Sequence, residues 1–108
     1  MIPVLKGADF IAKEIAKYVD RSDRLALHLD YHFGGYAKTT PELLNFMSDF
    51  IAQTGMLIDP VYTAKMFFAI NDLKQQGKLN EDVKILAIHT GGLMGILGMK
   101  EKLANLFP

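Results

Sequence analysis

The sequence contains no cysteine among its 108 residues. This absence excludes disulfide bonds and metal sites that are built on thiolates. Twelve basic and twelve acidic side chains balance, so the chain has no formal net charge, and no basic run of five residues occurs. Because nucleic acids and anionic membranes select clustered positive charge, the composition predicts neither as a partner.

No apolar run approaches the roughly 18 residues that a membrane-spanning helix requires. The first residues, MIPVLKGADF, lack the layout of a signal peptide. Hydrophobic residues make up 50% of the chain, which is enough for one core at this length. We therefore expect a single cytoplasmic, globular unit over residues 1–108.

The stretch VKILAIHTGGLMGILG, residues 83–98, is the most informative part of the sequence. Its apolar beginning, 83–89, is typical of a strand that is buried on both faces. Thr90-Gly91-Gly92 then interrupts the run, and an apolar segment with helical spacing follows. Glycines allow a sharp turn and the close approach of a ligand, and free N–H groups at a helix start suit an anion. The turn either faces a ligand or simply connects a strand to a helix.

Alternating leucines in RLALHLDY predict a second strand over 24–31. Thr40 has the character of an N-cap before Pro41, and Asp59-Pro60 starts a helix by the same logic. We expect helices over 8–19, from Pro41 to near Gly55, over 60–76, and at the C-terminal end through Leu103 to Leu106. The helix over 60–76 is apolar around most of its circumference, which predicts that it is largely buried.

Alternation of strands and helices predicts an α/β fold with a parallel sheet and right-handed connections. The expected architecture is a partial three-layer parallel sheet flanked by helices. Two strands that are buried on both faces need neighbours on each side, so this sheet should belong to a larger one. Exposed edges and apolar faces should make the chain associate with itself, as a homo-oligomer, or with a missing portion.

Three segments carry a resemblance to a known family: LDYHFGGYAKTTPELL, TGMLIDPVYTAKM and ILAIHTGGLMG. They resemble the C-terminal part of the pyridoxal-phosphate (PLP) enzymes that include D-cysteine desulfhydrase and 1-aminocyclopropane-1-carboxylate (ACC) deaminase. The resemblance spans nearly the whole chain. It implies a C-terminal segment of a fold-type II, tryptophan-synthase-β-like enzyme, with PLP as the cofactor and a small amino acid as the substrate.

The resemblance also implies roles for individual residues. Tyr36 and Tyr62 match active-site tyrosines, whose hydroxyls can orient a substrate carboxylate or transfer a proton. Thr90 matches the residue that hydrogen-bonds the pyridine nitrogen of the cofactor, with Gly91 and Gly92 letting the ring come close. From the residues alone, a core aromatic with a solvated hydroxyl is the favoured interpretation of Tyr62, and Thr90 could cap the last helix.

Two positions depart from the family pattern. The tyrosine at position 36 is often followed by glycine in the family, whereas Ala37 stands here. The position of Thr63 is typically glutamate in ACC deaminases, where the carboxylate can hold a proton on the pyridine nitrogen and strengthen the electron sink. Two neutral hydroxyls, Thr63 and Thr90, should leave the sink weaker. We therefore favour β-elimination from D-cysteine over ACC deamination.

The lysine that forms the Schiff base in this family lies in an N-terminal block, as does the loop that binds the cofactor phosphate. Neither block occurs here, and neither Lys38 nor Lys65 occupies a position that the family uses for cofactor attachment. We expect a C-terminal fragment, or one piece of a split enzyme, that is inactive without the N-terminal portion. The alternative is a non-catalytic α/β segment for packing, oligomerisation or binding a small anion at Gly91-Gly92.

Overall fold

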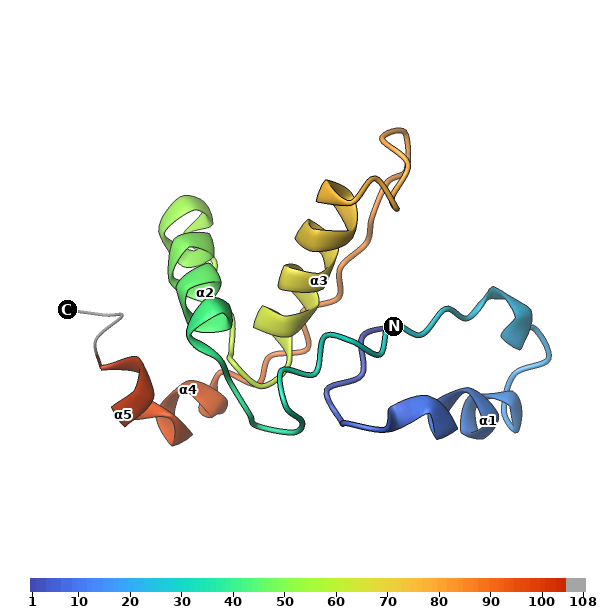
Figure 1. Cartoon of the computed structure of the whole chain (residues 1–108), viewed down its shortest axis with the longest axis horizontal. Helices are drawn as coiled ribbons and strands as arrows, with labels where there is room; N and C mark the ends of the chain where they lie inside the picture. Colours follow the sequence, from blue (N-terminus) through green and yellow to red (C-terminus); the bar gives the residue numbers. More distant parts are fainter. Residues whose placement is uncertain (105–108) are drawn as a thin grey trace.

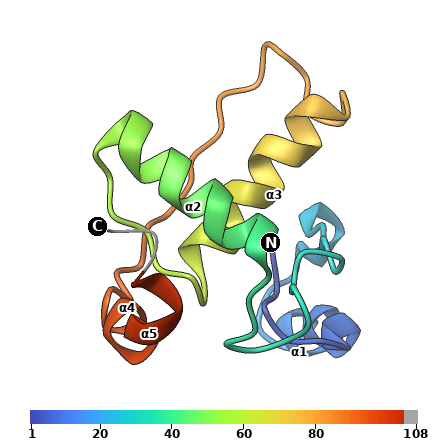
Figure 2. The same ribbon diagram turned by 60° about the vertical axis from the view of Figure 1, so that its left-hand side comes forward.

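Two helices, α2 (Pro41–Thr54) and α3 (Thr63–Gln75), form the centre of the protein. The computed structural model of the chain describes residues 1–104. Figure 1 shows α2 and α3 diverging from neighbouring lower ends, and Figure 2 shows α2 crossing in front of α3. The remaining elements are short: a 3-10 helix Ala8–Phe10, α1 (Ile11–Ala16), a 3-10 helix Ser22–Arg24, α4 (Met94–Gly98) and α5 (Lys100–Leu103).

Helix α2 begins and ends where its sequence signals predict. The Thr40 hydroxyl accepts a hydrogen bond from the backbone N–H of Leu43 at 3.2 Å, which satisfies one free donor of the first turn. Pro41 occupies the first helical position. Gly55 ends the helix with a left-handed φ of 71°, and its N–H donates to the carbonyl of Ile51 at 2.8 Å.

Helix α3 begins at Thr63, three residues later than predicted, because residues 60–62 form a turn around the Asp59 carboxylate. It ends in a Schellman motif at Gly77, whose φ is 69°. The N–H of Lys78 donates to the carbonyl of Leu73 and the N–H of Gly77 to that of Lys74, both at 3.0 Å. The first turns of α3 are its most buried part, whereas Asn71, Lys74 and Gln75 near its end are exposed.

The core lies between α2 and α3 and is rich in phenylalanine. The rings of Phe50 and Phe67 lie 4.6 Å apart between centroids, and Phe46 meets Phe68 edge to face at 5.3 Å. The fully buried centre of this cluster consists of Leu43, Met47, Ile58, Ala64 and Leu103. Since Leu103 belongs to it, α5 packs back onto the pair of central helices.

The predicted partial parallel sheet is wrong: residues 1–104 contain no strand. The backbone of the segment 24–31 makes two hydrogen bonds to the N-terminus: Met1 N donates to the Ala26 carbonyl at 2.8 Å, and His28 N donates to the Met1 carbonyl at 3.0 Å. The segment 83–89 runs beside α3 as irregular chain (Figure 1). A strand requires a hydrogen-bonded neighbour along its length, and an apolar pattern alone does not supply one.

Two predicted helices are also shorter or divided. The one predicted over 8–19 is a 3-10 turn followed by α1, which ends at Ala16. The C-terminal one is divided into α4 and α5, and its predicted end at residues 105 and 106 lies outside the described residues. Among the described residues, no helix is long and apolar enough to cross a membrane.

The protein has more surface than a self-contained domain of its size. It exposes 7675 Å², whereas a folded monomer of this mass is expected to expose about 6000 Å². The radius of gyration is 14.8 Å, compared with about 13 Å for a compact domain of this length. Much of the excess is apolar, because Val83, Ile85, Leu86 and Ile88 are all exposed.

Candidate functional site

The turn Asp59-Pro60-Val61-Tyr62 is organised by the buried carboxylate of Asp59. Oδ1 accepts hydrogen bonds from the N–H groups of Val61 at 2.8 Å and Tyr62 at 2.7 Å. Oδ2 accepts from the N–H of Thr63 at 3.1 Å and from its hydroxyl at 2.6 Å. The carboxylate therefore satisfies the free donors at the start of α3 and holds Tyr62 in one orientation.

Tyr36 and Tyr62 meet at the surface although they come from different parts of the chain. The Tyr62 hydroxyl donates to the Tyr36 hydroxyl at 3.3 Å, and the ring centroids lie 6.1 Å apart in an edge-to-face arrangement. The hydrogen bond to Tyr36, together with some desolvation, raises the pKa of Tyr62 above its ordinary value. Both side chains are exposed, so the paired hydroxyls are accessible to a ligand.

The Thr90-Gly91-Gly92 segment packs against this turn. A Cβ added at Gly92 would lie 3.4 Å from Asp59 Oδ2 and 3.7 Å from the Tyr62 ring. Gly91 and Gly92 have φ values of 88° and 74°, which side chains rarely adopt. Upstream, His89 accepts from the N–H of Gly91 at 3.0 Å through Nδ1, and its Nε2 lies 2.9 Å from the Leu57 carbonyl oxygen. Since Nδ1 is an acceptor, Nε2 is the donor to Leu57.

A cavity of about 610 Å³ opens beside the turn. Tyr62, Thr63 and Thr90 line it at one end, and His28 is a further polar group. The rest of its wall is apolar and comes from the N-terminal residues, α3 and residues 85–88. An apolar cavity with a few converging polar groups is the usual form of a small-molecule site.

The two threonines that line the cavity differ in burial and in hydrogen bonding. The Thr63 hydroxyl is buried, donates to Asp59 Oδ2 and accepts from the N–H of Asp59 at 2.7 Å, so both of its roles are occupied within the turn. Thr90 is exposed. A Cβ added at Gly91 would meet nothing within 4 Å, so open space lies over this residue, beside Thr90. Thr90 is thus the better placed of the two for contact with a ligand.

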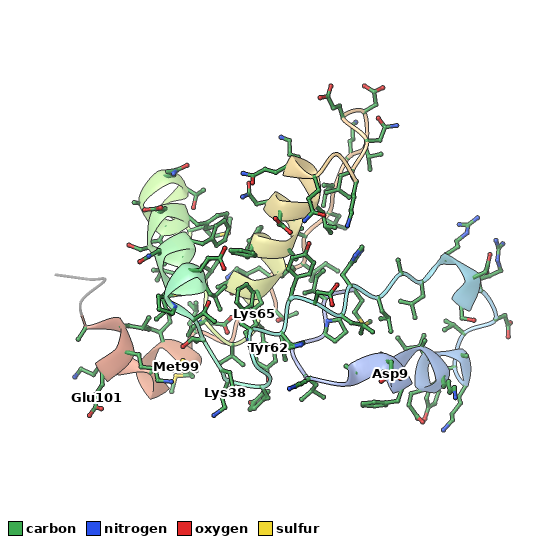
Figure 3. The ribbon with its side chains drawn as sticks, in the orientation of Figure 1. Asp9, Lys38, Tyr62, Lys65, Met99 and Glu101 are labelled. Carbon is green, nitrogen blue, oxygen red and sulfur yellow. The ribbon has the colours of Figure 1, made fainter. Side chains whose placement is uncertain are left out.

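Sequence reasoning missed the part that Lys65 plays. Its side chain is fully buried, and its ammonium donates to the carbonyl oxygens of His32 at 2.8 Å and Gly35 at 2.9 Å. Burial lowers the pKa of Lys65, while the Asp59 carboxylate acts in the opposite direction. The available signal was a single lysine inside the apolar stretch of a helix predicted to be buried. Lys38, by contrast, is exposed (Figure 3).

Proteins of known sequence resemble this chain over most of its length. A Pyrococcus horikoshii protein, provisionally named as an ACC deaminase, is 43% identical over 77 residues, which cover 71% of this chain and 23% of the relative. The mitochondrial bifunctional D-cysteine desulfhydrase/ACC deaminase of Arabidopsis thaliana is 41% identical over 73 residues, which cover 67% of this chain and 18% of the relative. The matched region is thus about a quarter or less of each relative. No family model matches the chain.

The structural comparison agrees. The crystal structure of an ACC deaminase homologue superposes with a TM-score of 0.82 at 32% identity, covering 98% of this chain and 34% of the homologue. The similarity includes all the segments that form the tyrosine pair and the glycine turn, because it extends over nearly all of the chain. The chain belongs to the family of ACC deaminases and D-cysteine desulfhydrases, of which it resembles the C-terminal part.

Proposed function

We propose that this chain supplies the substrate-facing tyrosines and the contact to the pyridine nitrogen in a PLP-dependent enzyme that acts on a small amino acid. The observation that carries the proposal is the accessible pair of Tyr36 and Tyr62 hydroxyls, of which Tyr62 belongs to the turn that packs against Thr90-Gly91-Gly92. When bound, PLP would withdraw electrons from the substrate carbon that loses its proton. Membership of the family supports this assignment.

The residues around Thr90 fit the nitrogen edge of a pyridine ring. The exposed Thr90 hydroxyl can donate one hydrogen bond to a neutral ring nitrogen. The space over Gly91 is open, and a side chain at that position would fill it. Thr90 would hold the nitrogen, and Gly91 and Gly92 would admit the ring. Thr63 lines the same cavity as Thr90 and would therefore lie near the ring.

The tyrosine pair can bind the substrate and carry a proton. Because the hydrogen bond to Tyr36 raises its pKa, the Tyr62 hydroxyl keeps its proton at neutral pH and remains a donor. It can therefore orient a substrate carboxylate or deliver a proton to the product. Loss of a positioned acid–base group typically lowers the rate about 10²- to 10⁴-fold. Tyr62→Phe, which retains the ring, should lower kcat within that range in the assembled enzyme.

The reaction we favour is β-elimination from D-cysteine: removal of the α-proton, loss of hydrogen sulfide, and hydrolysis to pyruvate and ammonia. Thr63 provides no carboxylic acid beside Thr90, and its hydroxyl is already bonded to Asp59. Two neutral hydroxyls at the nitrogen contact suit the departure of a thiolate better than the opening of a cyclopropane ring. ACC deamination is the second candidate, favoured by the names of the relatives.

A hybrid enzyme tests the choice of reaction. Residues 1–108 would replace the matching segment of the Arabidopsis thaliana bifunctional enzyme, whose name includes both activities. We expect the ratio of hydrogen sulfide formed from D-cysteine to ammonia formed from ACC to rise above that of the parent enzyme. Efficient ACC turnover by the hybrid without hydrogen sulfide from D-cysteine would refute our choice.

Substitution of Thr63 tests the reason for the choice. In the hybrid, Thr63→Glu should shift the ratio toward ACC, because it places a carboxylic acid near the nitrogen contact. The matched control is Thr63→Val, which retains the shape and removes only the hydroxyl that bonds Asp59. A shift that appears equally in both variants would come from the lost bond to Asp59 and would contradict the role given to the carboxylic acid.

Catalysis also requires a lysine and a phosphate-binding loop, which we assign to a further portion of the enzyme. The chain alone should therefore bind PLP weakly and release no hydrogen sulfide. Absorbance above 400 nm after addition of PLP, and borohydride reduction followed by mass spectrometry, measure this directly. A stable yellow complex in which PLP becomes covalently fixed to the 108-residue chain would contradict the assignment.

A further inference from the structure

The buried ammonium of Lys65 connects helix α3 to the loop that carries Tyr36. Its nitrogen donates to two carbonyl oxygens of that loop, His32 and Gly35, the second belonging to the residue directly before Tyr36. Hydrogen bonds from a charged donor are roughly twice as strong as those between neutral groups. Figure 3 shows Lys65 close to Tyr62 at the lower end of α3.

The loop needs such a restraint because its backbone is unusual. Phe33 and Ala37, on either side of the Gly34-Gly35-Tyr36 segment, have φ values of 54° and 57°, and Gly34 and Gly35 are also in the positive region. A residue with a Cβ adopts this region at a cost of about 1–2 kcal/mol. Such a conformation persists only where surrounding contacts define it strongly.

The same helix turn places the other tyrosine. Tyr62 precedes Lys65 by three residues, and the Asp59 carboxylate holds its N–H at 2.7 Å. One end of α3 therefore orients Tyr62 through Asp59 and the Tyr36 loop through Lys65. The two hydroxyls, which lie 3.3 Å apart, thus belong to segments that are both attached to this end of α3.

We propose that Lys65 is a positioning residue: its ammonium, bonded to the carbonyls of His32 and Gly35, holds the Tyr36 hydroxyl within reach of Tyr62. This role in substrate binding rests on the proposed function, but the positioning itself can be measured without cofactor or substrate. The pKa of Tyr62 reports it, because the bond to Tyr36 is the main cause of its elevation. Simple loss of a nearby cation would raise a tyrosine pKa further. A fall in the pKa of Tyr62 is therefore specific to loss of its hydrogen bond to the Tyr36 hydroxyl.

The absence of cysteine allows a closely matched pair of side chains at position 65. The Lys65→Cys chain would be alkylated while unfolded, either with 2-bromoethylamine or with 1-bromopropane, and then refolded. The two products have equal length and differ only in an ammonium or a methyl group at the end. The pKa values of the tyrosines would be followed by NMR of ¹³Cζ-labelled tyrosine, with Lys38→Met as a control for loss of an exposed cation from the same loop.

Tyr31 serves as an internal marker of folding, because burial and its bond to Asp72 raise its pKa to about 12. We expect the aminoethyl chain and Lys38→Met to retain the raised Tyr62 pKa. In the propyl chain the pKa of Tyr62 should fall toward the ordinary value of tyrosine, with Tyr31 still at about 12. An unchanged Tyr62 pKa in the propyl chain would overturn the proposal. So would loss of the Tyr31 value there, because Lys65 would then hold the whole fold rather than the tyrosine pair.

Discussion

At the scale of single residues, the bond between Tyr31 and Asp72 makes stability depend on pH. The Tyr31 hydroxyl donates to the carboxylate at 2.7 Å, and burial and this bond raise its pKa to about 12. The folded protein therefore holds this proton more tightly than the unfolded chain does. The stabilisation is fully present below a pH of about 10, and it is lost as the pH rises through about 12.

Urea unfolding at intervals between pH 8 and 12 measures this loss. Tyr31→Phe keeps the ring against Phe68 but removes the proton, so its free energy of unfolding should be lower below pH 10 and should approach that of the original chain above it. If the difference between the two chains stays constant over this range, the bond does not control the pH dependence.

The two glycines of the Thr90-Gly91-Gly92 turn should respond differently to alanine. Both have positive φ values, so Gly91→Ala and Gly92→Ala should each cost about 1 kcal/mol or more of stability. Only at Gly92 would the new Cβ also contact Asp59 Oδ2, at 3.4 Å, which limits how far the strained backbone can relax. We expect the larger loss for Gly92→Ala in chemical denaturation. Equal losses would show that the turn does not pack tightly on Asp59.

The resemblance indicated which residues are candidates for the site, but the sequence did not indicate all of the contacts that hold them. Resemblance to the family singled out Tyr36, Tyr62 and Thr90, and the structure brings the two tyrosine hydroxyls together. Asp59 was predicted only as the start of a helix, and the role of Lys65 was not predicted. Their partners are backbone groups, whose position depends on the path of the chain rather than on the identity of a neighbouring residue.

At the scale of elements, α2 illustrates how a short polar signal determines a helix start. The Thr40 hydroxyl accepts from the Leu43 N–H, and its removal by Thr40→Ala should lower stability by about 1 kcal/mol. Thr40→Ser retains the acceptor and should lose little. Thr39→Ala is the matched control at the neighbouring position. Thermal unfolding compares them, and a loss for Thr39→Ala equal to that for Thr40→Ala would contradict the capping role.

The two long helices were predicted better than the strands, for a physical reason. The ends of α2 and the cap at Gly77 depend on local contacts, which a short sequence pattern encodes. The predicted strands over 24–31 and 83–89 depend on distant hydrogen-bonding partners, which a local pattern cannot supply. Their apolar side chains instead lie in irregular chain, partly along the cavity and partly in solvent.

At the scale of the whole molecule, the large exposed apolar surface should promote association. Leu86 is 86% exposed beside the cavity, and Ile88 is 66% exposed. Surfaces of this kind usually mark a contact with another protein segment.

Sedimentation velocity over a range of concentrations should show association that Leu86→Lys weakens. Tyr18→Lys is the control, because Tyr18 is 85% exposed, follows the end of α1 and does not line the cavity. Equal effects of the two substitutions would exclude this surface as the contact.

Because Ala37 has a left-handed conformation, the effects of substitutions at positions 37 and 65 should depend on each other. At a φ of 57°, alanine is strained where glycine would not be, and Lys65 restrains the loop that contains it. Exchange of Lys65 should therefore be tolerated more easily in a chain that already carries Ala37→Gly than in the present one. If the two positions interact in this way, the order of substitutions matters in evolution. Glycine at position 37 should come first, and Lys65 can be exchanged only afterwards.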